Sequence, residues 1–218
     1  WVWQILQANT SCREVVRQVQ ALFALECAGP VDEATGAYCQ ARSKIPLAVL
    51  EEAFGATARS AQRRAPSSKA LQGRTIKVVD GTNCRLADTQ PNRKAFPPPK
   101  SLPPGCGFPL IKIVVLFSLA TGALLARATG HQGLNEVRLC EKLRAFLAKS
   151  DIVIADRAYG IFSVLAWLQS LGVDAITRVP TRLRRVDFRK AKQRFRTGEG
   201  LFVWLKPTKP SAFLPRIE

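Results

Sequence analysis

From residue 74 onward the chain alternates strand-like and helix-like apolar runs, and this alternation restricts its possible folds more than any other feature. A β-branched run from Thr75 to Asp80 predicts a strand, and the apolar run at 110–130 is split by a Thr121-Gly122 turn into two paired strands. A helix is predicted from about Asn135 to Lys149. It is followed by the strand "DIVIAD", the helix "GIFSVLAWLQSLG" and the strand "VDAITRV". The predicted order is strand, strand, strand, helix, strand, helix, strand.

This order is typical of a ribonuclease-H-like sheet, in which three antiparallel strands are followed by parallel strands reached through helical crossovers. Before the sheet, a helix capped at Ser11, a second at Thr35 to Lys44 and a third through Phe54 are predicted, and residues 55–74 have linker composition. The predicted fold class is α/β: a helical N-terminal region, an incomplete ribonuclease-H-like mixed sheet and the start of a strand-rich insertion. The corresponding domains are 1–70, 71–180 and 181–218.

The N-terminal helices allow two interpretations. Tyr38, Arg42 and Lys44 lie on the middle helix, where they could form the reading surface of a DNA-binding helix-turn-helix. A small helical bundle with exposed basic residues is the commoner arrangement, and the sequence leaves both open.

The charge balance points to a polyanionic partner. Lys and Arg number 33 against 16 acidic residues, which gives a net charge of +17 and a pI near 10.4. No apolar run reaches the length of a spanning helix and no basic amphipathic helix stands out, so nucleic acid is favoured over a membrane surface. Six cysteines without a Cys-x-x-Cys pair, beside one histidine, disfavour structural zinc and predict reduced thiols in a cytoplasmic protein.

Two carboxylates are the strongest candidates for chemistry. Asp80 and Asp156 each end a predicted strand, and in the predicted fold these two strands are neighbours. Paired acids with oxygen ligands suit Mg²⁺ or Mn²⁺, and two such ions promote phosphoryl transfer. The alternative is that both residues only terminate strands, since Asp-Gly is an ordinary strand terminator.

Three blocks, "VVDGTNCRLADTQPNRKAFPPP", "GFPLIKIVVLFSLATGALL" and "DIVIADRAYGIF", resemble those of DDE transposases of the insertion-sequence-four type, and "SCREVV" with "TGAYCQARSKIP" resembles their N-terminal region. The resemblance implies that Asp80 and Asp156 are the first and second metal-binding acids. It also implies that Thr82, Arg157 and Tyr159 contact DNA or hold the acids. The implied partners are double-stranded DNA, as transposon ends and target, and a second subunit in a full-length homodimer.

One part of the family pattern is missing. The third acid is expected on a later helix with Tyr, Arg, Glu and Lys at fixed spacing, and nothing in the chain fits. The chain also lacks methionine and ends at "KPTKPSAFLPRIE", so we expect a fragment that stops inside the insertion, with "LFVWLKP" as one of its strands. Such a fragment is expected to be inactive alone.

A basic segment at 178–196 is the main candidate DNA-binding surface. It holds nine basic residues against one acid, with Phe188 and Phe195 between them. A solvated charged face is the alternative. With Arg178 at its start, the segment contains the candidate contacts Arg182, Arg184, Arg185, Arg189, Lys190, Lys192, Arg194 and Arg196. The single histidine, His131, precedes a predicted helix and is interpreted as a cap or surface residue.

Three functions remain open on this basis. The first is a transposase fragment whose full-length form cuts transposon ends and joins 3′-hydroxyls to target DNA by two-metal phosphoryl transfer. The second is a non-catalytic DNA-binding protein or inhibitor derived from a truncated transposase. The third, a basic structural or ribosome-associated protein, explains the charge but not the two Asp blocks.

Overall fold

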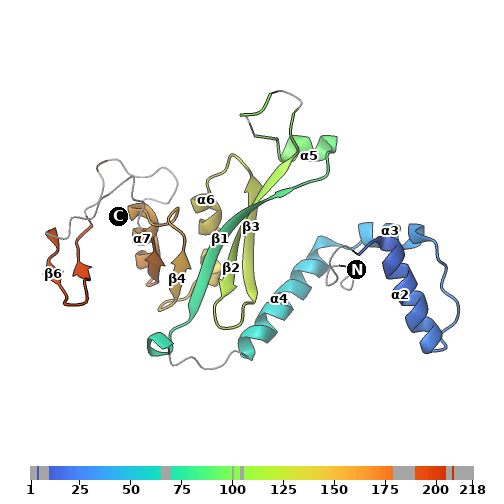
Figure 1. Cartoon of the computed structure of the whole chain (residues 1–218), viewed down its shortest axis with the longest axis horizontal. Helices are drawn as coiled ribbons and strands as arrows, with labels where there is room; N and C mark the ends of the chain where they lie inside the picture. Colours follow the sequence, from blue (N-terminus) through green and yellow to red (C-terminus); the bar gives the residue numbers. More distant parts are fainter. Residues whose placement is uncertain are drawn as a thin grey trace. The chain divides into compact units, whose positions relative to one another are not determined.

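The structure is a computed structural model that describes residues 10–64, 70–99, 101–103, 106–178 and 190–204, together with Gln4 and Thr208. Its chain divides into two compact units, Trp1–Ala56 and Thr57–Glu218 (Figure 1). The predicted three domains stay a prediction. No described helix has the length and apolar character needed to cross a membrane.

The first unit is helical, as predicted. Helix α2 (Cys12–Leu25) begins at Ser11, whose side chain accepts a hydrogen bond from the backbone of Glu14, and helix α3 (Thr35–Ser43) follows. Helix α4 (Leu47–Arg63) starts in this unit and ends in the second. The predicted linker at 55–74 is therefore wrong as far as Arg63, because the alanine-rich stretch that follows Gly55 has a high helix propensity. A short 3-10 helix, η1 (Ala70–Gly73), precedes the sheet.

The second unit contains a five-stranded sheet in the order β3-β2-β1-β4-β5. Its strands are β1 (Ile76–Arg85), β2 (Leu110–Ser118), β3 (Leu124–His131), β4 (Ile152–Ala155) and β5 (Asp174–Thr177). The β1–β2 and β2–β3 pairs are antiparallel, whereas β1–β4 and β4–β5 are parallel. This mixed sheet confirms the predicted α/β fold class and its ribonuclease-H-like strand order.

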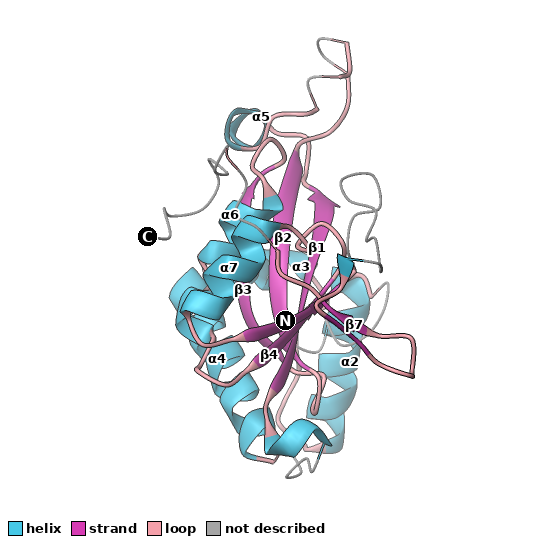
Figure 2. Cartoon of the chain, turned by 90° about the vertical axis from the view of Figure 1, so that its left-hand side faces the viewer, coloured by secondary structure: helices cyan, strands magenta, loops and turns pink. Residues whose placement is uncertain are grey.

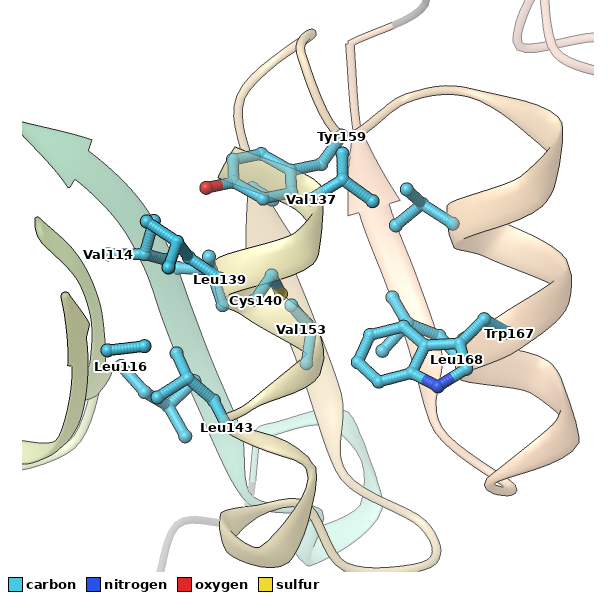
Figure 3. Packing of buried hydrophobic residues seen from close by; sticks show 14 of the residues in the cluster. Val114, Leu116, Val137, Leu139, Cys140, Leu143, Val153, Tyr159, Trp167 and Leu168 are labelled. Atoms are coloured by element: carbon cyan, nitrogen blue, oxygen red, sulfur yellow. The ribbon is translucent and has the colours of Figure 1, made fainter. Parts of the chain in front are cut away.

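The hydrophobic core lies between one face of this sheet and two helices, α6 (Glu136–Glu141) and α7 (Phe162–Ser170) (Figures 1 and 2). Alternate strand residues such as Val79, Val114 and Leu116 face Leu139 of α6, and Trp167 of α7 is 3% exposed (Figure 3). The crossover helices are thus fixed to the sheet by apolar burial.

Three elements differ from the sequence-based expectations. Strand β1 continues past Asp80 to Arg85, because β2 pairs with it over this whole length. The helix expected at 135–149 stops at Glu141 and is followed by the 3-10 turn η2 (Arg144–Phe146). In the predicted strand "LFVWLKP" only Leu201 is in a strand; it belongs to β7 (Gly200–Leu201), which pairs with β6 (Gln193–Arg194), and residues 205–207 lie outside the described residues.

Between β1 and β2 the chain forms the short helix α5 (Gln90–Ala95), with Thr89 as its N-cap. The half-buried guanidinium of Arg93 pairs with Asp88 there, at 2.5 and 2.8 Å. The ring of Phe108 lies below the guanidinium carbon of Arg85, 5.9 Å from the ring centroid. These local contacts involve the described part of the segment between β1 and β2.

Candidate active site

The pairing of β1 with β4 brings the two candidate acids together. The parallel register joins Ile76 to Ile152 and continues to Val79 with Ala155. Asp80 and Asp156 are the next residue on each strand. Neighbouring strands lie about 4.8 Å apart, so the two Cα atoms are separated by roughly one strand spacing. The register thus places the two acids next to paired positions on neighbouring strands, and their role as a metal-binding pair stays a prediction.

Both carboxylates are exposed, and each is oriented by its own backbone. The Oδ1 atom of Asp80 accepts a hydrogen bond from Gly81 N at 2.8 Å, and Oδ1 of Asp156 accepts one from Ala158 N at 2.8 Å. These contacts occupy one oxygen of each carboxylate, so each side chain has oxygen capacity left for a further ligand. Asp80 lies where pairing with β4 ends but pairing with β2 continues, and for this reason it is not a simple strand terminator.

The turn after Asp156 buries the side chain of Tyr159. Tyr159 N donates to Asp156 O at 3.2 Å, and the ring lies over Val137 in the core, 2% exposed (Figure 3). Burial is the main cause that raises the pKa of this tyrosine, and the nearby Cys140 and acidic groups add to it. The hydroxyl therefore stays protonated. The buried ring does not present a surface for a DNA contact, and the implied role of holding the acids stays a prediction.

Thr82 and Arg157 are both exposed next to the acids. Thr82 lies two residues after Asp80 on the same strand, so both side chains project from the same face of β1. Arg157 directly follows Asp156. Their positions allow contact with a phosphate near the carboxylates, and their DNA-binding role stays a prediction.

The basic segment is described only in part. Lys190, Lys192, Arg194 and Arg196 are exposed on and around the β6–β7 hairpin, which turns at Gly198 and carries the half-exposed Phe195. The other candidates, Arg182, Arg184, Arg185 and Arg189, lie outside the described residues together with Phe188. His131 is exposed at the end of β3, which agrees with a surface role.

The Asp-Arg-x-Tyr-Gly block ends in a glycine that the packing requires. A Cβ atom on Gly160 would lie 2.4 Å from the carbonyl oxygen of Arg178 and 3.1 Å from Thr177 Oγ1. The turn after β4 therefore lies directly against the end of β5. Only a residue without a side chain permits this approach.

Replacing Gly160 by alanine should destabilise the chain by about 1–3 kcal/mol, because the backbone of β5 must move away from the new methyl group. Urea-induced unfolding measures this change. The matched control is Gly36→Ala, where an added Cβ meets nothing within 4 Å. Equal stabilities of the two variants would contradict the close approach.

Among the described residues, no group of three or more His, Cys, Asp or Glu side chains is arranged to hold a metal ion. Asp80 and Asp156 alone form the candidate ligand pair. Hard divalent cations prefer carboxylate oxygens and keep several waters, so two exposed carboxylates with oxygen capacity left fit Mg²⁺ or Mn²⁺.

The strand order is that of a ribonuclease-H-like sheet, and the two carboxylates follow its neighbouring strands β1 and β4. The sequence profile of the family described as "Transposase DDE domain" matches residues 71–207, which is more than half of the chain. The chain belongs to this family. Transposases of the family act on DNA and generally use divalent metal ions.

The chain is also similar to a solved structure, a piggyBac transposase synaptic complex with hairpin DNA. The sequence identity is 11% and the TM-score 0.37; the match covers 55% of this chain and 26% of that chain. The chain thus spans about a quarter of that transposase. No curated protein sequence matches it.

Proposed function

We propose that the chain is the catalytic region of a transposase of the insertion-sequence-four type, and that Asp80 and Asp156 hold its divalent cation. The observation that carries this proposal is the β1–β4 register, which makes the two acids neighbours inside the segment matched by the family profile. The three motif blocks support the insertion-sequence-four assignment.

The residues of the chain have distinct roles in this proposal. Asp80 and Asp156 bind and orient Mg²⁺ or Mn²⁺ through their carboxylate oxygens. When bound, the metal activates a water or a 3′-hydroxyl and stabilises the leaving oxygen of the DNA strand. Arg157 and Thr82 contact phosphates beside the acids. The buried Tyr159 holds the turn that presents Asp156.

In the full-length protein a third carboxylate completes the metal site, and the protein acts as a homodimer on transposon ends and target DNA. The family resemblance supports both statements. Among the described residues we assign only Asp80 and Asp156 to the metal site, and we propose that transposition requires a further carboxylate. A cytoplasmic location is consistent with this function.

DNA binding tests the proposal directly. The purified chain should bind a random duplex with an affinity that falls linearly with salt on logarithmic axes, at about −0.9 per phosphate contact. Fluorescence anisotropy between about 50 and 200 mM salt measures the slope. No binding at low salt, or binding insensitive to salt, would refute the proposal.

A matched pair of variants locates the contact surface. Changing Lys190, Lys192, Arg194 and Arg196 to Gln should make the slope shallower by about 0.9 for each lost phosphate contact. The control variant, Lys142→Gln with Lys149→Gln, should leave the slope unchanged. Both lysines are exposed on the segment that leads into the start of β4, whereas Asp156 follows the end of that strand. An equal effect of both sets would indicate non-specific charge attraction.

The alternative is a non-catalytic DNA-binding protein or inhibitor derived from such a transposase. It predicts the same salt dependence but no divalent-cation site. Calorimetry with Mn²⁺ separates the two functions: binding that requires Asp80 and Asp156 supports the transposase site, and no Mn²⁺ binding supports the alternative.

A further inference from the structure

Glu136, an acid that the sequence analysis did not select, lies against the residue that follows Asp80. A Cβ atom placed on Gly81 would lie 2.9 Å from both Cδ and Oε2 of Glu136, so the glutamate carboxylate occupies the space over this glycine. Gly81 N is the donor that holds Oδ1 of Asp80. Glu136 therefore packs directly on the residue whose backbone orients the first candidate acid.

Lys112 on β2 lies beside this glutamate. Its Nζ lies 3.8 Å from Oε1 of Glu136 and donates to the carbonyl oxygen of Leu134 at 2.9 Å. The lysine side chain is 14% exposed and that of Glu136 32% exposed. Such a half-buried pair is screened less by solvent than a surface pair, so the lysine favours the charged carboxylate at this place.

A second observation points to the same place. The hydroxyl of Tyr159 has no hydrogen-bond partner among the described residues, although the residue is 2% exposed. Figure 3 shows this hydroxyl directed away from α7. After burial and Cys140, the acids Glu136, Asp156 and Asp80 raise the pKa of this hydroxyl. A buried hydroxyl without a partner is costly unless a group arrives to accept its hydrogen bond.

We propose that Glu136 is a positioning residue of the metal site: it fixes Gly81 and thereby the orientation of Asp80 toward a hydrated divalent cation. Tyr159 donates its hydrogen bond to this group of carboxylates, or to a water of the cation, when the ion is bound. This inference rests on the proposed function and goes beyond it, because the ligand pair alone does not require Glu136. Outer-shell residues commonly set the affinity of a metal site.

The variant Glu136→Gln tests the inference with little change in side-chain volume. It should weaken Mn²⁺ binding, measured by calorimetry, by about tenfold. The metal-free thermal midpoint should stay close to that of the parent chain. Glu141→Gln at the other end of α6 is the matched control and should leave Mn²⁺ affinity unchanged.

The double variant Glu136→Gln with Lys112→Gln separates positioning from net charge, since it removes both members of the pair. The loss of Mn²⁺ affinity should persist in it. Gly81→Ala should displace the glutamate side chain without changing charge, and should weaken Mn²⁺ binding as well. Tyr159→Phe keeps the ring in the core and should show a smaller loss.

The outcomes distinguish this inference from the proposed function. Unchanged Mn²⁺ affinity in Glu136→Gln, with binding abolished in Asp80→Asn, would overturn the role of Glu136 and leave the function standing. Full recovery of affinity in the double variant would also overturn it, since the effect would then be the uncompensated charge of Lys112. Mn²⁺ binding that is insensitive to Asp80→Asn and Asp156→Asn would refute the proposed site itself.

Discussion

Replacing Asp151 by alanine should destabilise the folded chain by about 3–5 kcal/mol, the effect of breaking a buried ion pair by removing one partner. Asp151 Oδ2 lies 2.5 Å from Lys77 Nζ, with side chains 6% and 11% exposed. The substitution leaves the ammonium group buried without its carboxylate. The ammonium group of Lys77 then keeps the hydrogen bond that it donates to the carbonyl oxygen of Phe146 at 2.7 Å.

The expected loss is large because Asp151 joins several elements. Its Oδ2 also accepts a hydrogen bond from Ala148 N at 2.7 Å, just before β4, while Lys77 lies on β1. Arg74 donates to the carbonyl oxygen of Asp151 at 3.2 Å. The pair therefore links the start of β4 to β1, and the β1–β4 register places the two candidate acids.

Urea-induced unfolding of Asp151→Ala and Lys77→Met measures the effect. The double variant Lys77→Met with Asp151→Leu should recover part of the lost stability, because no unpaired charge remains. Asp88→Asn breaks the exposed pair with Arg93 and should leave the urea midpoint nearly unchanged. A loss in Asp151→Ala no larger than in Asp88→Asn would contradict the buried role of the pair.

The arrangement of the acids could be predicted because it depends on local patterns and a strong topological rule. The β-branched runs before Asp80 and Asp156 are distinct in the sequence, and helical crossovers make their strands parallel neighbours. Once the two strands pair, residues in matching positions project from the same face. The sequence therefore predicted that the strands leading to the two acids are parallel neighbours.

The remaining errors arise where long-range contacts override local signals. Asp80-Gly81 looks like a strand end, but β2 continues the ladder to Arg85. The helix predicted to reach Lys149 ends early; here the carbonyl of Phe146 accepts from Lys77, and Ala148 N donates to Asp151. Lys77 is 69 residues from Phe146, whereas Asp151 lies only three residues after Ala148.

Glu136 was missed for the same reason. In the sequence it is an ordinary acid in the first turn of a helix, a position that favours acidic residues in any helix. Only the fold brings it onto Gly81, 55 residues earlier in the chain. The one available signal was the glycine after Asp80, which also indicates space for a neighbouring side chain.

Asp80→Asn or Asp156→Asn should reduce the affinity of the folded chain for Mn²⁺ by at least about a hundredfold. This exceeds the loss of metal affinity that is usual when a residue behind the metal ligands is replaced. Each substitution keeps the shape of the side chain but replaces a charged oxygen ligand by an amide. Both residues are exposed, so folding should be preserved. Calorimetry with Mn²⁺ measures the loss, and thermal unfolding checks the fold.

DNA binding by the same two variants should be unchanged or tighter, because each removes a negative charge close to the phosphates. Weaker Mn²⁺ binding together with unchanged or tighter DNA binding indicates the loss of a metal site. General damage to the protein would weaken the binding of both Mn²⁺ and DNA. Asp174→Asn is the matched control: Asp174 begins β5 beside Ile152, at the end of β4 away from Asp156, and pairs with Arg74. It should leave Mn²⁺ affinity unchanged. Mn²⁺ affinity retained in both Asp80→Asn and Asp156→Asn would show that these acids do not bind the cation, and the DNA-binding alternative would then account for the chain.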